Sequence, residues 1–259
     1  MTGPPAGAVG LGGPPVSLDP ARPLAVRHLT ERLTLAVVSI AWLRAQGDTA
    51  RARTEKRHLS AREAAQARLL PSPRRRYEWL AGRLALKHAV TAYQHRRLGR
   101  SGEPRAIQVS ALRDGPRAGK PVVDVPAEVG LSHSGDFAVA VCGPHAIGVD
   151  LEHRRELPPM VSELLTHDGD PYSARAGPRQ VAAMPLALRW ACKEAVLKYY
   201  GFGLRIDTRE VGLTGWEQDG RFRWSAGPGL LRRAPAAGSV RLESWAGETN
   251  GYSLALVWT

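Results

Sequence analysis

Two acidic residues in one short apolar stretch are spaced so that both could bind a divalent cation. In Gly148-Val149-Asp150-Leu151-Glu152 an extended chain puts Asp150 and Glu152 on the same face, because side chains alternate along a strand. Two carboxylates this close repel each other unless a cation lies between them, and ligands that are all oxygen favour Mg²⁺. Alone, the pair is equally typical of a solvated sheet edge, so both interpretations stay open.

A third carboxylate lies in the stretch Trp190-Ala191-Cys192-Lys193-Glu194-Ala195-Val196-Leu197-Lys198. In a helix, Glu194 and Lys198 share one face because they are four residues apart, and this could be a weak surface ion pair. The opposite face is apolar, which predicts that the helix packs in the core with its charged edge directed at something. If that edge meets Asp150 and Glu152, Glu194 completes a Mg²⁺ site and Lys198 lies beside any phosphate held there.

Two further motifs carry groups that can bind phosphate oxygens. Ser132-His133-Ser134-Gly135-Asp136 offers hydroxyls, an imidazole and backbone N–H groups, and Gly119-Lys120-Pro121 carries one of only five lysines, close to Arg113 and Arg117. Each motif is also an ordinary turn. A hydrolase that uses Ser132 or Ser134 with His133 is disfavoured, because the Gly-x-Ser-x-Gly pattern is absent.

Hydrophobic periodicity predicts the elements that position these residues. In the first long helix we expect Trp79, Leu80, Leu84 and Ala85 to face one way, while Arg76, Arg83 and Lys87 line another. Gly201 and Gly203 should end the second long helix. The predicted helices are 62–70, 75–93, 160–166 and 186–200, and the predicted strands are 33–42, 107–109, 121–125, 137–142, 147–152, 211–216, 221–224, 240–245 and 252–258. Strands 137–142 and 147–152 should form an antiparallel pair, and the whole should be an α+β protein of two halves that meet near residue 145.

Composition limits the function classes. The chain has 259 residues, 43% of them hydrophobic, which is enough for a core, and no apolar run approaches the ~18 residues of a membrane span. Residues 1–24 hold six prolines and five glycines, which predicts a disordered leader without a secretory signal. Cys142 and Cys192 lie too far apart for a cysteine zinc site and suit a reducing cytoplasm.

The net charge of +12, from 36 basic and 24 acidic residues, predicts anionic partners. A nucleic-acid-binding protein is the main alternative, supported by the arginine-rich stretch 51–76. Against it, no zinc-finger, RNP-like or Gly-x-x-Gly signature is present, and aromatic residues make up only 6% of the chain.

In combination and in this order, the motifs resemble those of the Sfp-type 4′-phosphopantetheinyl transferases. That family shows a Gly-Lys-Pro turn, a Ser-His-Ser/Gly-like turn, an (Ile/Val)-Gly-(Ile/Val)-Asp-(Ile/Leu)-Glu strand and a Trp-x-x-Lys-Glu-(Ala/Ser)-x-x-Lys helix. Here they are residues 119–121, 132–135, 147–152 and 190–198. The Gly-Phe-Gly-Leu at 201–204 and the Leu-Ala-Gly-Arg at 80–83 also fit, so the resemblance runs from about residue 33 to the C-terminus.

The resemblance implies a pseudo-dimer of two similar α+β halves, each a small antiparallel sheet packed with one long helix, with coenzyme A in the cleft between them. The boundaries are then a leader at 1–24, an N-terminal half at 25–144 and a C-terminal half at 145–259. The chain would be a cytoplasmic monomer with no nucleic-acid or membrane partner.

The resemblance also implies roles for individual residues. Asp150, Glu152 and Glu194 would coordinate Mg²⁺, or Mn²⁺ in its place, together with the pyrophosphate of coenzyme A, which Lys198 would also contact. Glu194, or as a second choice Glu152, would accept the proton of the attacking serine. Ser132, His133 and Lys120, helped by Arg117 or Arg113, would bind phosphate oxygens of the adenosine 3′,5′-bisphosphate portion. Arg76 and Arg83 are looser candidates for its 3′-phosphate, and Pro121 would also bind the coenzyme. Gln66 stands where many relatives have a basic residue.

The implied reaction is the transfer of 4′-phosphopantetheine from coenzyme A to a serine of an acyl or peptidyl carrier protein, with release of adenosine 3′,5′-bisphosphate. Such a holo-[acyl-carrier-protein] synthase would serve polyketide, non-ribosomal peptide or fatty acid synthases. Carrier domains are typically acidic helical bundles, so the basic charge of this chain would attract them.

Overall fold

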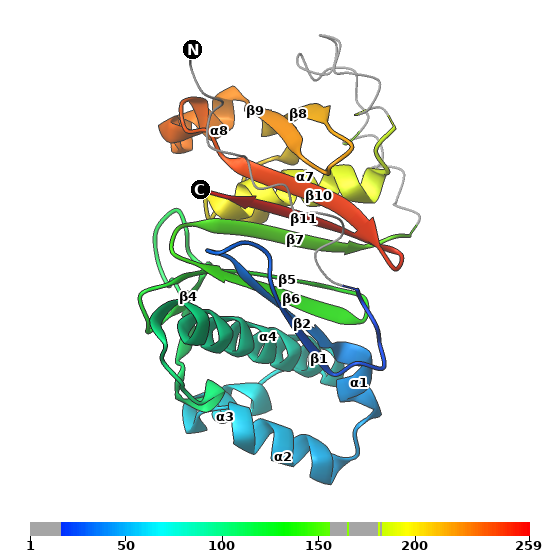
Figure 1. Cartoon of the computed structure of the whole chain (residues 1–259), viewed down its shortest axis with the longest axis vertical. Coiled ribbons are helices and arrows are strands. Elements are labelled where there is room, and N and C mark those ends of the chain that lie inside the picture. The colour runs from blue at the N-terminus through cyan, green and yellow to red at the C-terminus, as the bar shows by residue number, and fades with distance from the viewer. Residues whose placement is uncertain (1–16, 156–164, 166–180, 182) are drawn as a thin grey trace.

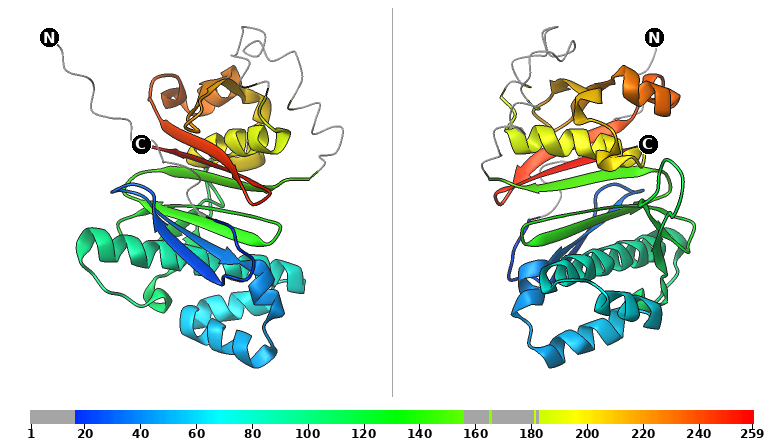
Figure 2. Two further views of the ribbon diagram at one scale, coloured as in Figure 1. Left: turned by 45° about the vertical axis from the view of Figure 1, so that its right-hand side comes forward. Right: turned by 180° about the vertical axis from the view of Figure 1, so that it is seen from behind.

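The computed structural model describes residues 17–155, 165, 181 and 183–259, and its main elements form four stacked layers in the order helix, sheet, sheet, helix (Figure 1). One helical layer comes from the N-terminal part of the chain and the other from the C-terminal part. The two sheets lie face to face between them, as the view from behind also shows (Figure 2).

The N-terminal sheet has the antiparallel strand order β1-β2-β6-β5. The long helix α4 (Pro73–Leu98) packs against β2, β5 and β6, and shorter helices lie beyond it (Figure 1). The strands of the sheet are β1 (Leu24–His28), β2 (Thr34–Ser39), β5 (Glu128–Ser134) and β6 (Phe137–Gly143). The other elements of this part are α1 (Ile40–Ala45), α2 (Asp48–His58), α3 (Ala61–Arg68), the 3₁₀ turn η1 (Pro104–Ala106) and the hairpin of β3 (Val109–Ala111) and β4 (Pro121–Val123).

The C-terminal sheet has the antiparallel order β10-β11-β7, with strands β7 (Ile147–His153), β10 (Glu243–Thr249) and β11 (Tyr252–Trp258). Helix α7 (Leu186–Tyr199) covers its outer face. Beyond α7 lie the hairpin of β8 (Val211–Trp216) and β9 (Phe222–Ala226), helix α8 (Pro228–Arg233) and the turns η2 (Gly203–Arg205), η3 (Thr208–Glu210) and η4 (Pro235–Gly238) (Figure 1).

Alternation along the strands builds the core between the sheets. Leu35 and Val37 of β2 face this core, whereas Ala36 and Val38 face α4. From the other sheet, Val149 and its neighbours on β7 and β11 complete the same apolar cluster. The two sheets are therefore held together by one shared hydrophobic layer.

Three predictions about strands are corrected by the structure. The strand expected at 33–42 ends at Ser39, whose hydroxyl accepts the backbone N–H of Trp42 and so caps α1. The pairing of 137–142 with 147–152 is wrong, because β6 pairs with β2 and β5, while β7 pairs with β11. One face of β7 carries Ile147, Val149 and Leu151 against the opposite sheet, and its other face, which carries Gly148, lies against α7. The motif at 132–136 is not simply a turn, since Ser132, His133 and Ser134 lie on strand β5.

Part of the predicted leader also differs from expectation. Leu18 is 2% exposed within the core between the sheets, and its N–H donates to Asn250 Oδ1 at 3.2 Å. Leu18 therefore packs against the fold, and Ser39 donates to the Pro20 and Pro23 carbonyls, while residues 19–23 stay exposed. Residues 1–16 lie outside the described ranges. The helix predicted at 160–166 also lies outside them, apart from Leu165. Of the helices that the structure describes, none is both long and apolar enough to cross a bilayer.

Candidate functional site

Strand β7 and helix α7 approach each other closely at Gly148. A Cβ atom on this residue would lie 1.8 Å from the backbone oxygen of Ala195, so no side chain fits there. This approach brings the acidic end of β7 beside the charged edge of α7, as the sequence predicted. Asp150 and Glu152 on the strand and Glu194 and Lys198 on the helix all border one cavity.

The cavity has a volume of about 690 Å³ and lies between β5, β7, α7 and the loops around residues 118–121 and 201–205. A volume of this size suits a small-molecule ligand. It brings together eight of the twelve residues that the sequence predicted as the site, namely Lys120, Pro121, Ser132, His133, Asp150, Glu152, Glu194 and Lys198.

A hydrogen-bond network joins the two main elements across the cavity floor. The Lys198 ammonium contacts Asp150 Oδ1 at 2.5 Å and Ser132 Oγ at 3.2 Å, and the Ser132 hydroxyl donates to Asp150 Oδ1 at 2.8 Å. Beside it, the Ser134 hydroxyl donates to Glu152 Oε2 at 3.2 Å. Within the described residues neither hydroxyl bonds to His133, so the serine–histidine pair of a hydrolase is not formed.

Two buried carboxylate oxygens in this cavity lack a hydrogen-bond partner among the described residues, Asp150 Oδ2 and Glu194 Oε1. Burial raises the pKa of Glu194 to about 7, with Lys198 opposing the rise and Asp150 and Glu152 adding to it. Burial, followed by the charge of Asp150, likewise raises the pKa of Glu152 to about 7. Burial disfavours the Lys198 ammonium, but the carboxylates of Asp150, Glu194 and Glu152 together outweigh it and raise the lysine pKa. Three carboxyl groups thus lie around one ammonium group, and burial favours the protonated form of Glu152 and Glu194.

The donor chemistry of these acids fits a hard divalent cation, because carboxylate oxygens without partners are the ligands that such ions prefer. Their present arrangement is not a finished metal site. Nowhere in the described ranges do three or more His, Cys, Asp or Glu side chains stand where they could share one metal ion. The Lys198 ammonium is instead the cation in contact with Asp150.

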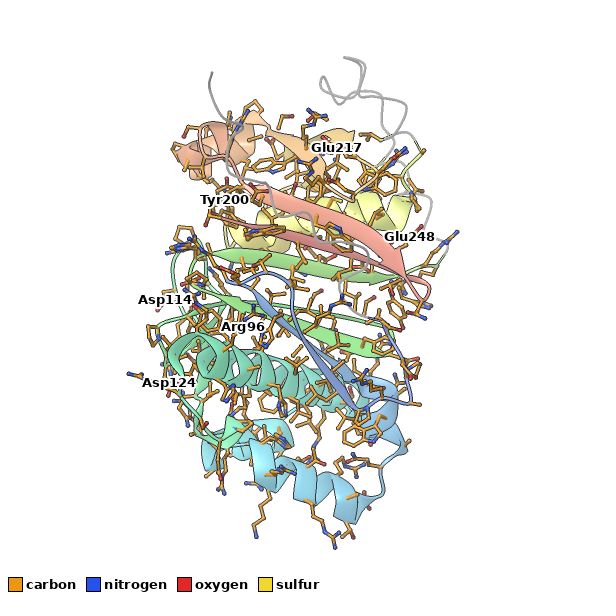
Figure 3. The ribbon with its side chains drawn as sticks, in the orientation of Figure 1. Arg96, Asp114, Asp124, Tyr200, Glu217 and Glu248 are labelled. Atoms are coloured by element: carbon orange, nitrogen blue, oxygen red, sulfur yellow. The ribbon has the colours of Figure 1, made fainter. Side chains whose placement is uncertain are left out.

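The loop that carries Lys120 closes one side of the cavity. Lys120 is buried and its ammonium contacts Glu128 Oε2 at 2.7 Å, so it already has a carboxylate partner. Arg113 and Arg117 are exposed and do not line the cavity, although the stem of Arg117 covers Gly201, where a Cβ would lie 2.6 Å from its Cγ. In Figure 3, Asp114 of the same loop and Tyr200 at the end of α7 lie on the same side of the molecule.

The structure does not place Arg76 and Arg83 at the cavity. Arg76 bonds to Glu55 of α2 at 2.8 Å. Arg83 lies over the Trp79 ring, 4.9 Å from its centroid, and 3.9 Å from Glu63 of α3. Both arginines turn toward α2 and α3 because those helices supply their carboxylate partners.

The position of Lys87 on α4 also differs from the prediction. It was expected on a charged face, but it is fully buried and donates to Glu63 Oε2 at 2.7 Å and to the Ile107 carbonyl at 2.8 Å.

Sequence reasoning missed two arginines near the cavity. Arg205 lines it and donates to the backbone oxygens of Ala118 and Gly201, and so ties two of its loops together. Its position directly after the Gly-Phe-Gly-Leu motif could have indicated that it belongs to the site. Arg75, at the start of α4, lies close enough to affect His133, whose pKa is lowered by partial desolvation and by Lys198 and Arg75, against the opposing charge of Glu78.

The C-terminal part of this chain is similar to known proteins. Residues 146–257 match the 4′-phosphopantetheinyl transferase superfamily. A curated relative, the 4′-phosphopantetheinyl transferase gsp of Aneurinibacillus migulanus, is 26% identical over 88 residues, which are 34% of this chain and 37% of that protein. The chain thus spans little more than a third of the length of that relative. Among solved structures, holo-[acyl-carrier-protein] synthase (AcpS) of Neisseria meningitidis is 26% identical, with a TM-score of 0.30 over 43% of this chain and 94% of that one.

Proposed function

We propose that this chain, whose residues 146–257 match the 4′-phosphopantetheinyl transferase superfamily, transfers 4′-phosphopantetheine from coenzyme A to a serine of a carrier protein. The observation that carries the proposal is the convergence of Asp150, Glu152, Glu194 and Lys198, from two distant stretches of sequence, on one cavity. Adenosine 3′,5′-bisphosphate is the second product of this transfer.

The acids of the cavity would hold Mg²⁺, with Mn²⁺ as a substitute. Asp150, Glu152 and Glu194 are the residues that would bind it, and the two carboxylate oxygens without partners support this assignment. Such an ion supplies charge neutralisation at a diphosphate. For the metal ion to bind, the Lys198 ammonium would move away from Asp150. The diphosphate of the substrate would then give this ammonium another anionic oxygen to bind.

The chain's own residues would then act on substrate and proton. Lys198 would stabilise the negative charge that grows on the departing phosphate, and Lys120, Ser132 and His133 would bind phosphate oxygens of the nucleotide. Arg205 joins this set because it lines the same cavity. Glu194 would accept the serine proton, since its carboxylate borders the cavity beside Lys198. Glu152 is the second choice for the base.

We further propose that the chain is a pseudo-dimer, with similar halves at 25–144 and 145–259. The strand order β2-β6-β5 matches β7-β11-β10, and each set of strands is covered by one long helix. The helices share a spacing as well, because Trp79 precedes Lys87, and Trp190 precedes Lys198, by the same number of residues. The halves differ in what the lysine meets: Lys198 contacts Asp150 at the cavity, whereas Lys87 contacts Glu63 in the interior.

The carrier protein is proposed from charge. The net charge of +12 favours an acidic partner, as an acyl or peptidyl carrier domain of a polyketide, non-ribosomal peptide or fatty acid synthase would be. The two free cysteines, both buried, agree with a reducing compartment such as the cytoplasm.

The test is to incubate an apo carrier domain with coenzyme A, Mg²⁺ and the protein, and to look by mass spectrometry for one added phosphopantetheine. EDTA should abolish the addition and excess Mg²⁺ should restore it. Asp150→Ala and Glu194→Gln should each lower the transfer rate by about a hundredfold or more while the circular dichroism spectrum stays unchanged.

Glu217→Gln is the matched control. It changes a carboxylate on the far side of α7 from the cavity, where Glu217 pairs with Arg221 and Arg223 (Figure 3), and it should leave the rate unchanged. Full turnover by the Asp150 or Glu194 variant would contradict the assignment of the acids. No transfer by the wild-type protein to any of several carrier domains would contradict the proposed reaction.

A further inference from the structure

A second cavity, of about 450 Å³, lies among the N-terminal elements and shares no lining residue with the first. It is bordered by β2, the start of β1, α1, α2 and α4. Leu24, Val38, Trp42 and Leu84 give it an apolar wall. Its volume falls within the range of ~300–1,000 Å³ that is usual for small-molecule sites.

Positive charge is concentrated on one side of this cavity. Arg53 and Arg57 of α2 line it, are exposed to solvent, and have no hydrogen-bond or ion-pair partner among the described residues. The other arginine of α2, Arg51, is engaged with Asp48 and with the Tyr77 hydroxyl. Arg53 and Arg57 therefore leave two guanidinium groups free to bind an anion.

Two imidazoles also line this cavity. The rings of His58 and His88 are 5.1 Å apart between centroids. The His58 Nδ1–H donates to the Thr54 carbonyl at 2.8 Å, so that ring is held in place. Burial lowers the pKa of both histidines, that of His88 to about 4 with further contributions from His58 and Arg57. At neutral pH both rings are thus uncharged and extend the apolar wall, and the positive charge stays with the arginines.

The wall formed by α2 is weakly held. None of the residues of α2 is buried, and it is anchored by polar contacts such as Glu55 with Arg76 and Arg51 with Tyr77. A helix with so little buried apolar surface can open at low free-energy cost, which gives a ligand a way in.

We propose that this second cavity binds an amphipathic monocarboxylate, with its apolar body against Leu24, Val38, Trp42 and Leu84 and its carboxylate at Arg53 and Arg57. A nucleotide or inorganic phosphate fits less well, because the side chains of Leu24, Val38 and Leu84 offer no polar partner. Arginine recognises a carboxylate through paired, charge-assisted hydrogen bonds. The assignment is independent of the transferase activity, since no residue is common to the two cavities.

Octanoate is the probe, and octanol is its uncharged counterpart of the same chain length. We expect octanoate to bind the full-length protein saturably at one site by isothermal titration calorimetry, at least about tenfold more tightly than octanol, since a charge-assisted contact with a carboxylate accounts for such a factor. Arg53→Ala/Arg57→Ala should remove this preference for the acid and leave phosphopantetheine transfer unchanged.

The matched control is Arg62→Ala/Arg68→Ala. It removes two exposed arginines from the neighbouring helix α3, outside the cavity, and changes the net charge by the same amount. Octanoate affinity should survive in this variant. The proposal is overturned if octanoate does not bind saturably, if octanol binds equally well, or if both double variants weaken octanoate to the same extent.

Discussion

The buried ion pair between Lys87 and Glu63 allows a quantitative test of how the N-terminal elements are held together. Lys87 is 0% exposed and Glu63 is 3% exposed. In Lys87→Met the side chain keeps nearly the same volume, but the Glu63 carboxylate loses its ammonium partner and the Ile107 carbonyl loses its donor. Removal of one partner of a buried pair typically costs about 3–5 kcal/mol.

The remaining contacts of Glu63 place the expected value at the lower end of that range. Its Oε2 also accepts the backbone N–H of Ser60 at 2.9 Å and the Ser60 hydroxyl at 3.0 Å, and both bonds survive the substitution. We therefore expect Lys87→Met to lower the free energy of unfolding by about 3 kcal/mol. Urea denaturation followed by tryptophan fluorescence measures this quantity.

A double-mutant cycle separates the ion pair from packing. Glu63→Gln/Lys87→Met removes both charges of the pair with little change in volume and should be more stable than Lys87→Met, because the buried Glu63 carboxylate is gone; the Arg83 guanidinium loses the charge 3.9 Å from it but keeps its contact with the Trp79 ring. The reasoning is refuted if Lys87→Met costs less than about 1 kcal/mol, or if the double variant is less stable than either single variant.

Two more predictions concern packing and pH. Gly148→Ala should destabilise the protein by about 3 kcal/mol or more and abolish transfer, because the new methyl group would force β7 away from α7 at Ala195. Thermal unfolding measures this loss of stability, and an unchanged Tm would contradict the prediction. Its control, Gly102→Ala, has no atom within 4 Å of the new Cβ and should be neutral. Since the pKa of His88 is lowered from 6.5 to about 4, the unfolded chain binds a proton that the native protein does not, so stability should fall as the pH drops from about 6.5 to about 4. His88→Asn should flatten this decline, and parallel pH profiles for variant and wild type would count against the assigned cause.

Local patterns in the sequence determined the regular elements with a buried face. The helix expected at 186–200 is found at Leu186–Tyr199, because its apolar face repeats with the helical period and Gly201, at φ +80°, follows its end. The strands at 211–216 and 252–258 are also found where alternation predicted them. Helix α2 was missed because none of its residues is buried, so it carries no hydrophobic period to detect.

The pairing of strands was decided by tertiary structure. Nearness in sequence favoured a hairpin of 137–142 with 147–152, yet β7 joins the strand nearest the C-terminus. A short connection permits a hairpin but does not require one. The sheet that a strand joins depends on which distant residues cover its two faces, and alternation along a single strand does not contain this information.

For the candidate site too, the sequence predicted some contacts and the tertiary structure decided others. The order and spacing of the motifs predicted that Asp150, Glu152, Glu194 and Lys198 would meet, and they do line one cavity. The partners of the basic residues on α4 were not predictable, since Lys87 and Arg83 both lie beside the carboxylate of Glu63, a residue of another helix. The residue types and their order along the chain encode what chemistry is available. Which charge meets which partner is decided only when distant elements pack, because desolvation and ion pairing depend on neighbours in space.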